Sequence, residues 1–242
     1  MEIRGERECK DCGTRWSYYE TGSVSCPNCE SVRSVGVDEE RKRHTAGQAA
    51  LDLTEVRNMI DAAPESDVAD AAIENCREFV RRTGFIDAGE LQPLDDVYLA
   101  ARELRQVADI VGRSYDPTED EELYYLSLLR GADRGERPAP DEVPAGLREA
   151  RGLAYAEAVQ AYRREIGTWI DDQDGEYPAA MGALATLGDH VKRIKALQGD
   201  VDPGTAERLV RAARNLAEAV RWDDEDALAR CRERLERLSD AQ

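Results

Sequence analysis

Two cysteine pairs near the amino end carry the clearest chemical signal in the sequence. Cys9 and Cys12 form one Cys-x-x-Cys pair, and Cys26 and Cys29 form a second pair after thirteen intervening residues. Each pair bends the chain tightly enough for two sulfurs to bind one ion, so the spacing predicts a tetrahedral four-cysteine zinc site. Because four thiolates leave no open coordination position, we expect the Zn²⁺ to be structural and not catalytic.

Other chemistry is compatible with cysteines at these spacings. A rubredoxin-like iron site uses the same four-sulfur shell, and Cys26-Pro-Asn-Cys29 fits it. Disulfides are disfavoured in a reducing cytosol, and a thioredoxin-like redox pair would have to open a helix after a strand. The remaining cysteines, Cys76 and Cys231, lie on predicted apolar helix faces. We expect them to be small buried hydrophobic residues, with redox sensing as the alternative.

The residues around the cysteine pairs predict a three-stranded zinc ribbon within residues 1–40. Arg15–Glu20 and Ser23–Ser25 are expected to form a hairpin, and a third strand is expected through Val32, Val35 and Val37. Structural zinc contributes about 10–16 kcal/mol of folding free energy to small units of this kind. We therefore expect the ribbon to fold only with its metal.

A basic stretch, Arg41-Lys-Arg-His44, follows the predicted ribbon. With exposed ribbon aromatics it would suit contacts with nucleic-acid phosphates and bases or with a protein groove; the residues concerned are Trp16, Tyr18, Tyr19, Arg41, Lys42 and Arg43. The interpretation we favour places Trp16 and Tyr18 in the ribbon core. It pairs the basic residues with nearby acids and leaves His44 in solvent; those acids are Asp38, Glu39 and Glu40.

From Thr45 onward the apolar period changes from two residues to about 3.6, which predicts an all-α body over residues 45–242. A capping box of Thr45 with Gln48 would start a first helix that reaches Ile60. The other segments with helical periodicity are about Glu65–Thr83, Pro93–Val111, Asp116–Gly131 (with Asp116 as its cap), Leu147–Asp171, Tyr177–Leu197, Asp202–Val220 and Asp223–Leu238.

Narrow, alanine-rich apolar stripes predict that these roughly eight helices pack as an antiparallel bundle. Residues 131–146 are rich in proline and glycine and poor in apolar residues, so they are a candidate linker that would subdivide the body. We expect His190, within the predicted 177–197 helix, to be a partly exposed surface residue.

The charge balance is strongly acidic, with 33 Lys+Arg against 51 Asp+Glu and a net charge of -18. This composition resembles that of proteins from salt-loving archaea. In molar salt the Debye length is about 3 Å, so the acidity does not exclude a nucleic-acid partner. The sequence has no apolar run long enough to span a membrane and no apolar segment typical of a secretion signal. We expect a cytoplasmic protein.

The cysteine pairs, together with Gly13, resemble the zinc ribbon of the transcription factor IIB type over about residues 5–37. The whole layout is similar to uncharacterised haloarchaeal proteins that carry such a ribbon ahead of an acidic helical body. The resemblance implies that the four cysteines bind zinc and that the ribbon docks on a polymerase or another large assembly.

Motifs typical of enzymes are missing from the sequence, including Ser-His-Asp order, a phosphate-binding loop, a dinucleotide fingerprint and His-Glu-x-x-His. We therefore expect a non-enzymatic adaptor or scaffold with a protein partner, in which the helical body could also form a homo-oligomer. The alternative is a nucleic-acid-binding regulator that uses the ribbon and Arg41–His44. A third hypothesis, an enzyme with a cleft between helices, requires convergent polar groups in an enclosed pocket.

Overall fold

The computed structural model of the chain describes residues 1–47, 49–113 and 117–240. The helix caps predicted at Gln48 and Asp116 lie outside these residues. The chain forms two compact units, which are discontinuous in sequence. The smaller unit contains Met1–Ala49 and Arg82–Gln92, and the larger unit contains Ala50–Arg81 and Pro93–Gln242.

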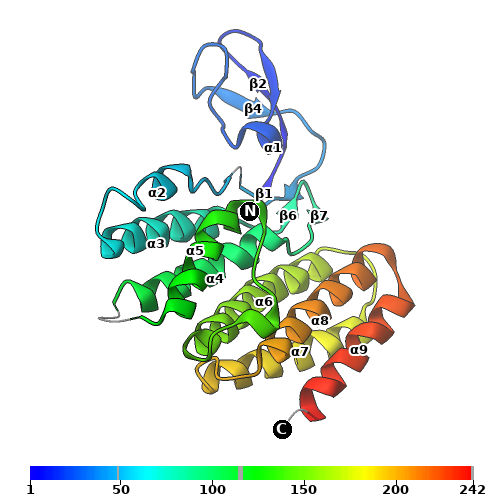
Figure 1. The fold of residues 1–242 in the computed structure, drawn as a ribbon. Helices are drawn as coiled ribbons and strands as arrows, with labels where there is room; N and C mark the ends of the chain where they lie inside the picture. The colour runs from blue at the N-terminus through cyan, green and yellow to red at the C-terminus, as the bar shows by residue number, and fades with distance from the viewer. Residues whose placement is uncertain (48, 114–116, 241–242) are drawn as a thin grey trace. The chain divides into compact units, whose positions relative to one another are not determined.

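The smaller unit is built on a three-stranded antiparallel sheet in the order β3-β2-β4 (Figure 1). Its strands are β2 (Glu6–Cys9), β3 (Arg15–Ser17) and β4 (Ser34–Gly36). The sheet therefore begins before the first cysteine pair, and the predicted hairpin between the two pairs does not form. Instead Tyr18–Thr21 is a short helix, α1, which ends where Gly22 donates its N–H to Tyr18 O with φ of 62°.

Two further strand pairs belong to this unit. β1 (Glu2–Ile3) pairs with β5 (Lys42–Arg43), and β6 (Ile86–Asp87) pairs with β7 (Glu90–Leu91). The β6–β7 hairpin turns through Ala88 and Gly89, whose φ angles are 50° and 88°. Two consecutive positive φ angles are typical of a type I′ turn.

The helix predicted to start at Thr45 is wrong over its first half. The backbone N–H groups of Thr45 and Ala46 both donate to Ile86 O, at 2.8 and 2.9 Å, and Thr45 Oγ1 accepts from Ile86 N at 3.0 Å. The groups that would have started a helix are therefore bonded to the β6–β7 hairpin. Among the described residues of this predicted segment, α2 (Thr54–Asn58) is the only helix.

The larger unit is an assembly of amphipathic helices (Figure 1). After α2 its long helices are α3 (Glu65–Arg82), α4 (Asp96–Val111), α5 (Glu119–Gly131), α6 (Arg148–Asp171), α7 (Pro178–Ala196), α8 (Pro203–Trp222) and α9 (Glu225–Asp240). Helix α6 contacts α4, α7 and α8, and α9 packs on α7 and α8. The chain is therefore mainly helical and carries its cysteine cluster in a small amino-terminal sheet region, which confirms the predicted fold class.

Side-chain caps fix where several of these helices begin. Asp95 accepts from Tyr98 N at the start of α4, and Asp202 accepts from Thr205 N at the start of α8. Helix α5 begins with a reciprocal capping box between Thr118 and Glu121. These capping groups satisfy backbone donors that a helix amino terminus leaves unpaired.

Residues 131–146 do not divide the helical body. They form the short 3₁₀ turns η1 (Ala132–Arg134), η2 (Pro140–Glu142) and η3 (Ala145–Leu147), and both flanking helices belong to the larger unit. Ala132 is buried, and the Arg137 side chain is only 11% exposed. The segment is anchored by these buried side chains and therefore does not act as a linker.

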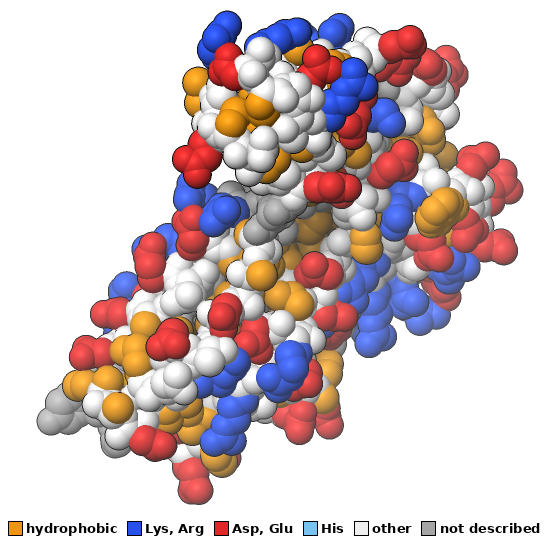
Figure 2. All heavy atoms as spheres, turned by 90° about the horizontal axis from the view of Figure 1, so that it is seen from above, with side chains coloured by type: hydrophobic (Ala, Val, Ile, Leu, Met, Phe, Trp, Pro, Cys, Tyr) orange, Lys and Arg blue, Asp and Glu red, His pale blue; other side chains and the backbone are white. Residues whose placement is uncertain are grey.

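Acidic and basic side chains are interspersed over the face drawn in Figure 2, with small hydrophobic areas between them. Within the described part of the chain, no helix is both long enough and apolar enough to cross a membrane.

Candidate metal centre

The four cysteines of the two predicted pairs converge in the smaller unit. Their sulfur atoms all lie within 4.8 Å of one another, with Cys9 Sγ 3.6 Å from Cys29 Sγ and Cys12 Sγ 3.5 Å from Cys26 Sγ. A tetrahedral ion with metal–sulfur bonds of about 2.3 Å needs sulfurs about 3.8 Å apart. These separations are far longer than the disulfide bond of about 2.05 Å. The residues therefore fit a single four-coordinate metal ion.

The two cysteine turns have the same backbone hydrogen bonds. In each turn the first cysteine donates its N–H to the carbonyl five residues later and accepts from the N–H four residues later. The bonds are Cys9 N to Thr14 O at 2.9 Å, Gly13 N to Cys9 O at 3.0 Å, Cys26 N to Ser31 O at 2.9 Å and Glu30 N to Cys26 O at 2.8 Å. The sulfurs are thus positioned by two copies of one local structure.

Hydrogen bonds shift the pKa values of two of these cysteines in opposite directions. Thr14, through its hydroxyl at 3.3 Å and its backbone, lowers the pKa of Cys12 to about 6. At Cys29 the backbone of Ser31 acts to lower the pKa, but contacts with the Cys12 and Cys9 sulfurs outweigh it and raise the pKa to about 12. A bound cation would favour the thiolate form of the cysteines that hold it.

Trp16 is a core residue and not an exposed stacking platform. Its side chain is 7% exposed and packs in a cluster with Cys9 and Cys26. The indole Nε1 donates to Ser23 O at 3.0 Å. The other predicted ribbon aromatics are half-buried, and Tyr19 donates its hydroxyl to Ile3 O at 3.0 Å.

The basic stretch is only partly available to a ligand. Arg41 and Lys42 are exposed, whereas Arg43 is half-buried and lies 3.4 Å from Glu2 Oε1. Among the acids expected to pair with this stretch, Asp38 instead accepts from the backbone N–H of Glu6 at 2.8 Å.

The expectation that His44 is solvated is wrong. Its side chain is 8% exposed, and its ring contacts those of Tyr18 and Tyr19, with centroid distances of 5.8 and 5.1 Å. Nδ1 is 3.1 Å from Asp87 Oδ1 and 3.3 Å from the N–H of Ala88. The β6–β7 hairpin therefore buries His44, which a local reading of residues 41–44 could not anticipate.

His190 on α7 is also buried, at 9% exposure, although we expected a partly exposed side chain. Burial and then the nearby Arg193 lower its pKa. Cys76 and Cys231 are buried as expected. Burial raises the pKa of Cys76 to about 12 and that of Cys231 to about 11.

A buried ionic network in the larger unit was missed by sequence reasoning. Glu103 of α4 is fully buried and accepts hydrogen bonds from the hydroxyls of Tyr124 and Tyr155, the latter at 2.9 Å. Arg151 of α6 is 1% exposed and lies 3.7 Å from Glu103; it donates to Glu207 at 2.8 Å. One signal was available: Arg151 lies one helical turn before Tyr155 on the same stripe.

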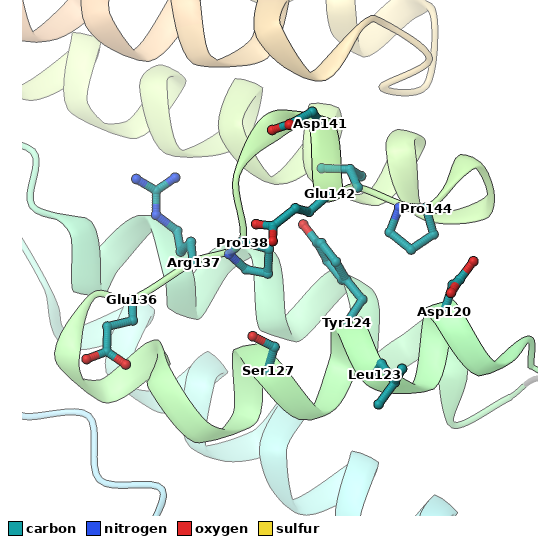
Figure 3. A pocket seen from close by; sticks show the side chains of 11 residues that line it. Asp120, Leu123, Tyr124, Ser127, Glu136, Arg137, Pro138, Asp141, Glu142 and Pro144 are labelled. Carbon is teal, nitrogen blue, oxygen red and sulfur yellow. The ribbon is translucent and has the colours of Figure 1, made fainter.

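The outer side of this network borders a cavity of about 600 Å³. Figure 3 shows the Tyr124 ring directed from α5 toward Pro138 and Glu142 on the facing segment. Burial, followed by the Glu103 charge, raises the pKa of Tyr124 far above its usual value, so this phenol remains a hydrogen-bond donor. Its partners are Glu103 and Arg151, which makes the group structural.

Comparison with protein-family models finds a match over residues 1–235 to the Family of unknown function (DUF7117). The chain belongs to this family. The match covers the cysteine centre and nearly all of the helical body, so the DUF7117 architecture includes both units. No curated protein and no solved structure matches this DUF7117 chain.

Proposed function

We propose that this protein is a non-enzymatic cytoplasmic adaptor, in which a zinc-stabilised ribbon docks on a protein partner and the helical body acts as a scaffold. The ribbon's outward apolar surface carries the proposal. Four valines of this small unit are 37–74% exposed, and they are Val24, Val32, Val35 and Val37. Exposed apolar residues gathered on one small element are typical of an interaction surface.

Strand register places two of these valines on the sheet face opposite the core. Arg7 is paired with Trp16, so their side chains share the buried face. Glu8 is paired with Val35 on its other side, and alternate residues of a strand point to opposite faces. Val35 and Val37 therefore lie on the face that does not contain Trp16.

The metal would give this surface a fixed shape. A closed shell of four thiolates suits structural Zn²⁺, which orders the turns without offering a catalytic position. The resemblance of the cysteine turns to ribbons of the transcription factor IIB type supports docking on a large assembly, and the acidic composition supports a haloarchaeal setting. Elemental analysis of the purified protein should find about one zinc per chain.

The test compares partner recovery by wild-type protein and by a Val35→Thr/Val37→Thr variant. Threonine keeps the β-branched shape and strand preference while adding a polar group to the outward face. Partners captured from lysate at native salt are identified by mass spectrometry, purified and bound again in isolation. We expect the variant to bind the purified partner about tenfold more weakly, as for the loss of central apolar contacts.

A matched control is Leu123→Thr, which adds the same polar group to α5, where the side chain is 58% exposed. This control should bind like wild type. Equal binding by the valine variant, or recovery of no macromolecular partner, would contradict the adaptor function.

A nucleic-acid-binding regulator is the less favoured proposal. It draws support from the exposure of Arg41 and Lys42 but lacks Trp16 as a stacking surface. Acidic side chains also line the hollow beside Lys42; they are Glu6, Asp38, Glu39 and Glu40. Binding of labelled single-stranded RNA that weakens in an Arg41→Gln/Lys42→Gln variant would favour this alternative over the adaptor.

A further inference from the structure

Trp222 stands in solvent at the end of α8. Its side chain is 69% exposed, whereas the other two tryptophans, Trp16 and Trp169, are each 7% exposed. A solvent-exposed tryptophan at a groove edge is typical of an anchor for binding, since tryptophan is enriched among the residues that dominate interface energy. Nothing in the ribbon's proposed role accounts for this side chain on the helical body.

An apolar groove of about 170 Å³ lies beside Trp222 where α7, α8 and α9 meet. Its apolar wall includes Tyr177, Pro178, Ala180, Ala219, Val220 and Leu228. Trp222 itself does not line the groove, but Val220 and Asp223 on either side of it in the chain do, so the exposed indole stands within one helical turn of the groove. The groove and the exposed indole therefore both lie at the carboxyl end of α8.

Two acidic segments that are far apart in sequence meet at this groove. Glu176 comes from the loop before α7, and three carboxylates come from the turn between α8 and α9, namely Asp223, Asp224 and Glu225. Arg230 lies 3.5 Å from Asp224 and 3.4 Å from Glu218, so it offsets part of this charge. The groove's rim remains negative.

One face of the Trp222 indole already contacts a cation of this chain, the guanidinium of Arg221. The guanidinium carbon of Arg221 lies 5.1 Å from the ring centroid, within the range of a cation–π contact. Because the tryptophan side chain is 69% exposed, most of its remaining surface is open to a second group.

We propose that this groove, with Trp222 and its acidic rim, is a docking site for a basic segment of a partner protein. An arginine or lysine of the segment would stack on Trp222 with its charge facing the carboxylates, while an adjoining apolar side chain fills the groove. Charge complementarity favours a basic peptide over a phosphate-bearing partner, because the carboxylates of the rim attract cations and repel phosphates. The site is separate from the valine surface of the ribbon, so either proposal can fail alone.

The test uses a fluorescein-labelled hexapeptide of alternating arginine and leucine. The control peptide carries citrulline, a neutral isostere, in place of each arginine. Anisotropy measures binding to the full-length, metal-loaded protein at one fixed salt concentration. We expect saturable binding of the arginine peptide, weaker binding as salt rises, and protection of tryptophan emission from acrylamide quenching.

Three variants locate the site. Trp222→Ala should weaken binding about tenfold, and Asp223→Asn/Glu225→Gln should weaken it about fivefold. Because these side chains are exposed, the variants should keep the wild-type circular dichroism spectrum. Leu123→Ala, at an exposed position on α5, is the matched control and should bind like wild type.

Equal binding of the citrulline peptide would overturn the requirement for a cation. Unchanged binding by Trp222→Ala, or no binding of the arginine peptide, would overturn the site. Sedimentation tests whether the groove instead binds a second copy of this chain. If the wild-type protein is a homodimer that Trp222→Ala dissociates, the proposal fails.

Discussion

Gly13 and Glu30 occupy the same position in the two cysteine turns, and both have a positive φ, 73° and 58° respectively. Each follows the second cysteine of its pair and donates its N–H to the first. A left-handed conformation suits glycine, whereas a residue with a Cβ adopts it at a cost of about 1–2 kcal/mol. The two turns are therefore alike in structure but unequal in strain.

Substitution at these positions should have opposite effects. Gly13→Ala should lower the free energy of unfolding of the metal-bound ribbon by about 1 kcal/mol, through backbone strain alone, because no atom lies within 4 Å of the added Cβ. Glu30→Gly should raise it by about 0.5 kcal/mol, since relief of strain exceeds the added entropy of the unfolded chain. Urea unfolding, followed by the NMR signals of backbone amides in the ribbon, measures both changes in unfolding free energy. A destabilising Glu30→Gly would show that the Glu30 side chain makes a larger contribution elsewhere.

Removal of the metal should unfold the ribbon and leave the helices folded. The small cluster of Cys9, Trp16 and Cys26 is the ribbon's core, so it depends on an ion that contributes about 10–16 kcal/mol. After treatment with a chelator, Trp16 emission should shift to longer wavelength while far-ultraviolet circular dichroism keeps its helical signal.

Cys29→Ser should produce the same result without a chelator. Cys231→Ala is the control, because it removes a buried thiol from the helical body and should retain the metal. Trp16 emission that does not respond to metal removal would contradict a metal-dependent ribbon.

Removing the Arg151 cation from the buried network should strongly lower the stability of the helical body, and the loss should depend on whether Glu103 keeps its charge. Arg151→Met removes the cation that faces Glu103 and Glu207, and uncompensated buried charge costs about 3–5 kcal/mol. Adding Glu103→Gln should restore part of this loss. Chemical denaturation of the single and double variants measures the coupling.

A surface pair supplies the control for that series. Arg113 and Asp109 form an ion pair with side chains 79% and 43% exposed. Arg113→Met should change the unfolding free energy by less than about 1 kcal/mol. Similar losses for Arg113→Met and Arg151→Met would mean that burial does not set the strength of the network.

Mild acid should destabilise the helical body through His190. Its pKa is lowered in the folded chain, chiefly by burial, so the unfolded chain binds a proton more readily. This contribution to stability is complete above the unfolded pKa of about 6.5 and is lost as pH falls through the lower folded pKa. Thermal unfolding between pH 7.5 and pH 5 should therefore show a smaller decline in His190→Gln than in wild type. An identical decline would assign the acid sensitivity to other groups.

Local signals in the sequence were enough to predict the cluster of four cysteines and most helices. The Cys-x-x-Cys spacing by itself brings two sulfurs of a pair together. The apolar residues of α3 through α9 recur at helical spacing within each helix, so no distant contact is needed to recognise them. The predictions that were wrong concern residues whose structure depends on contacts with distant parts of the sequence. Thr45 does not start a helix because it is hydrogen-bonded to Ile86, and His44 is buried because it contacts Asp87. Arg151 and Glu103 resemble surface residues when each helix is read alone, and their burial is explained by partners on other elements, which include Tyr124 and Glu207.

The division of the smaller unit between residues 1–49 and 82–92 has a consequence for synthesis. All four cysteines are translated before residue 30, so they emerge from the ribosome well ahead of residues 82–92 and can bind the ion first. Thr45 and Ala46 must wait for Ile86, and α3 is translated in between. A nascent chain paused before residue 86 would thus have its four cysteines bound to the ion while the β6–β7 hairpin that pairs with Thr45 and Ala46 is still missing. Treating such stalled chains with a chelator would detect this state.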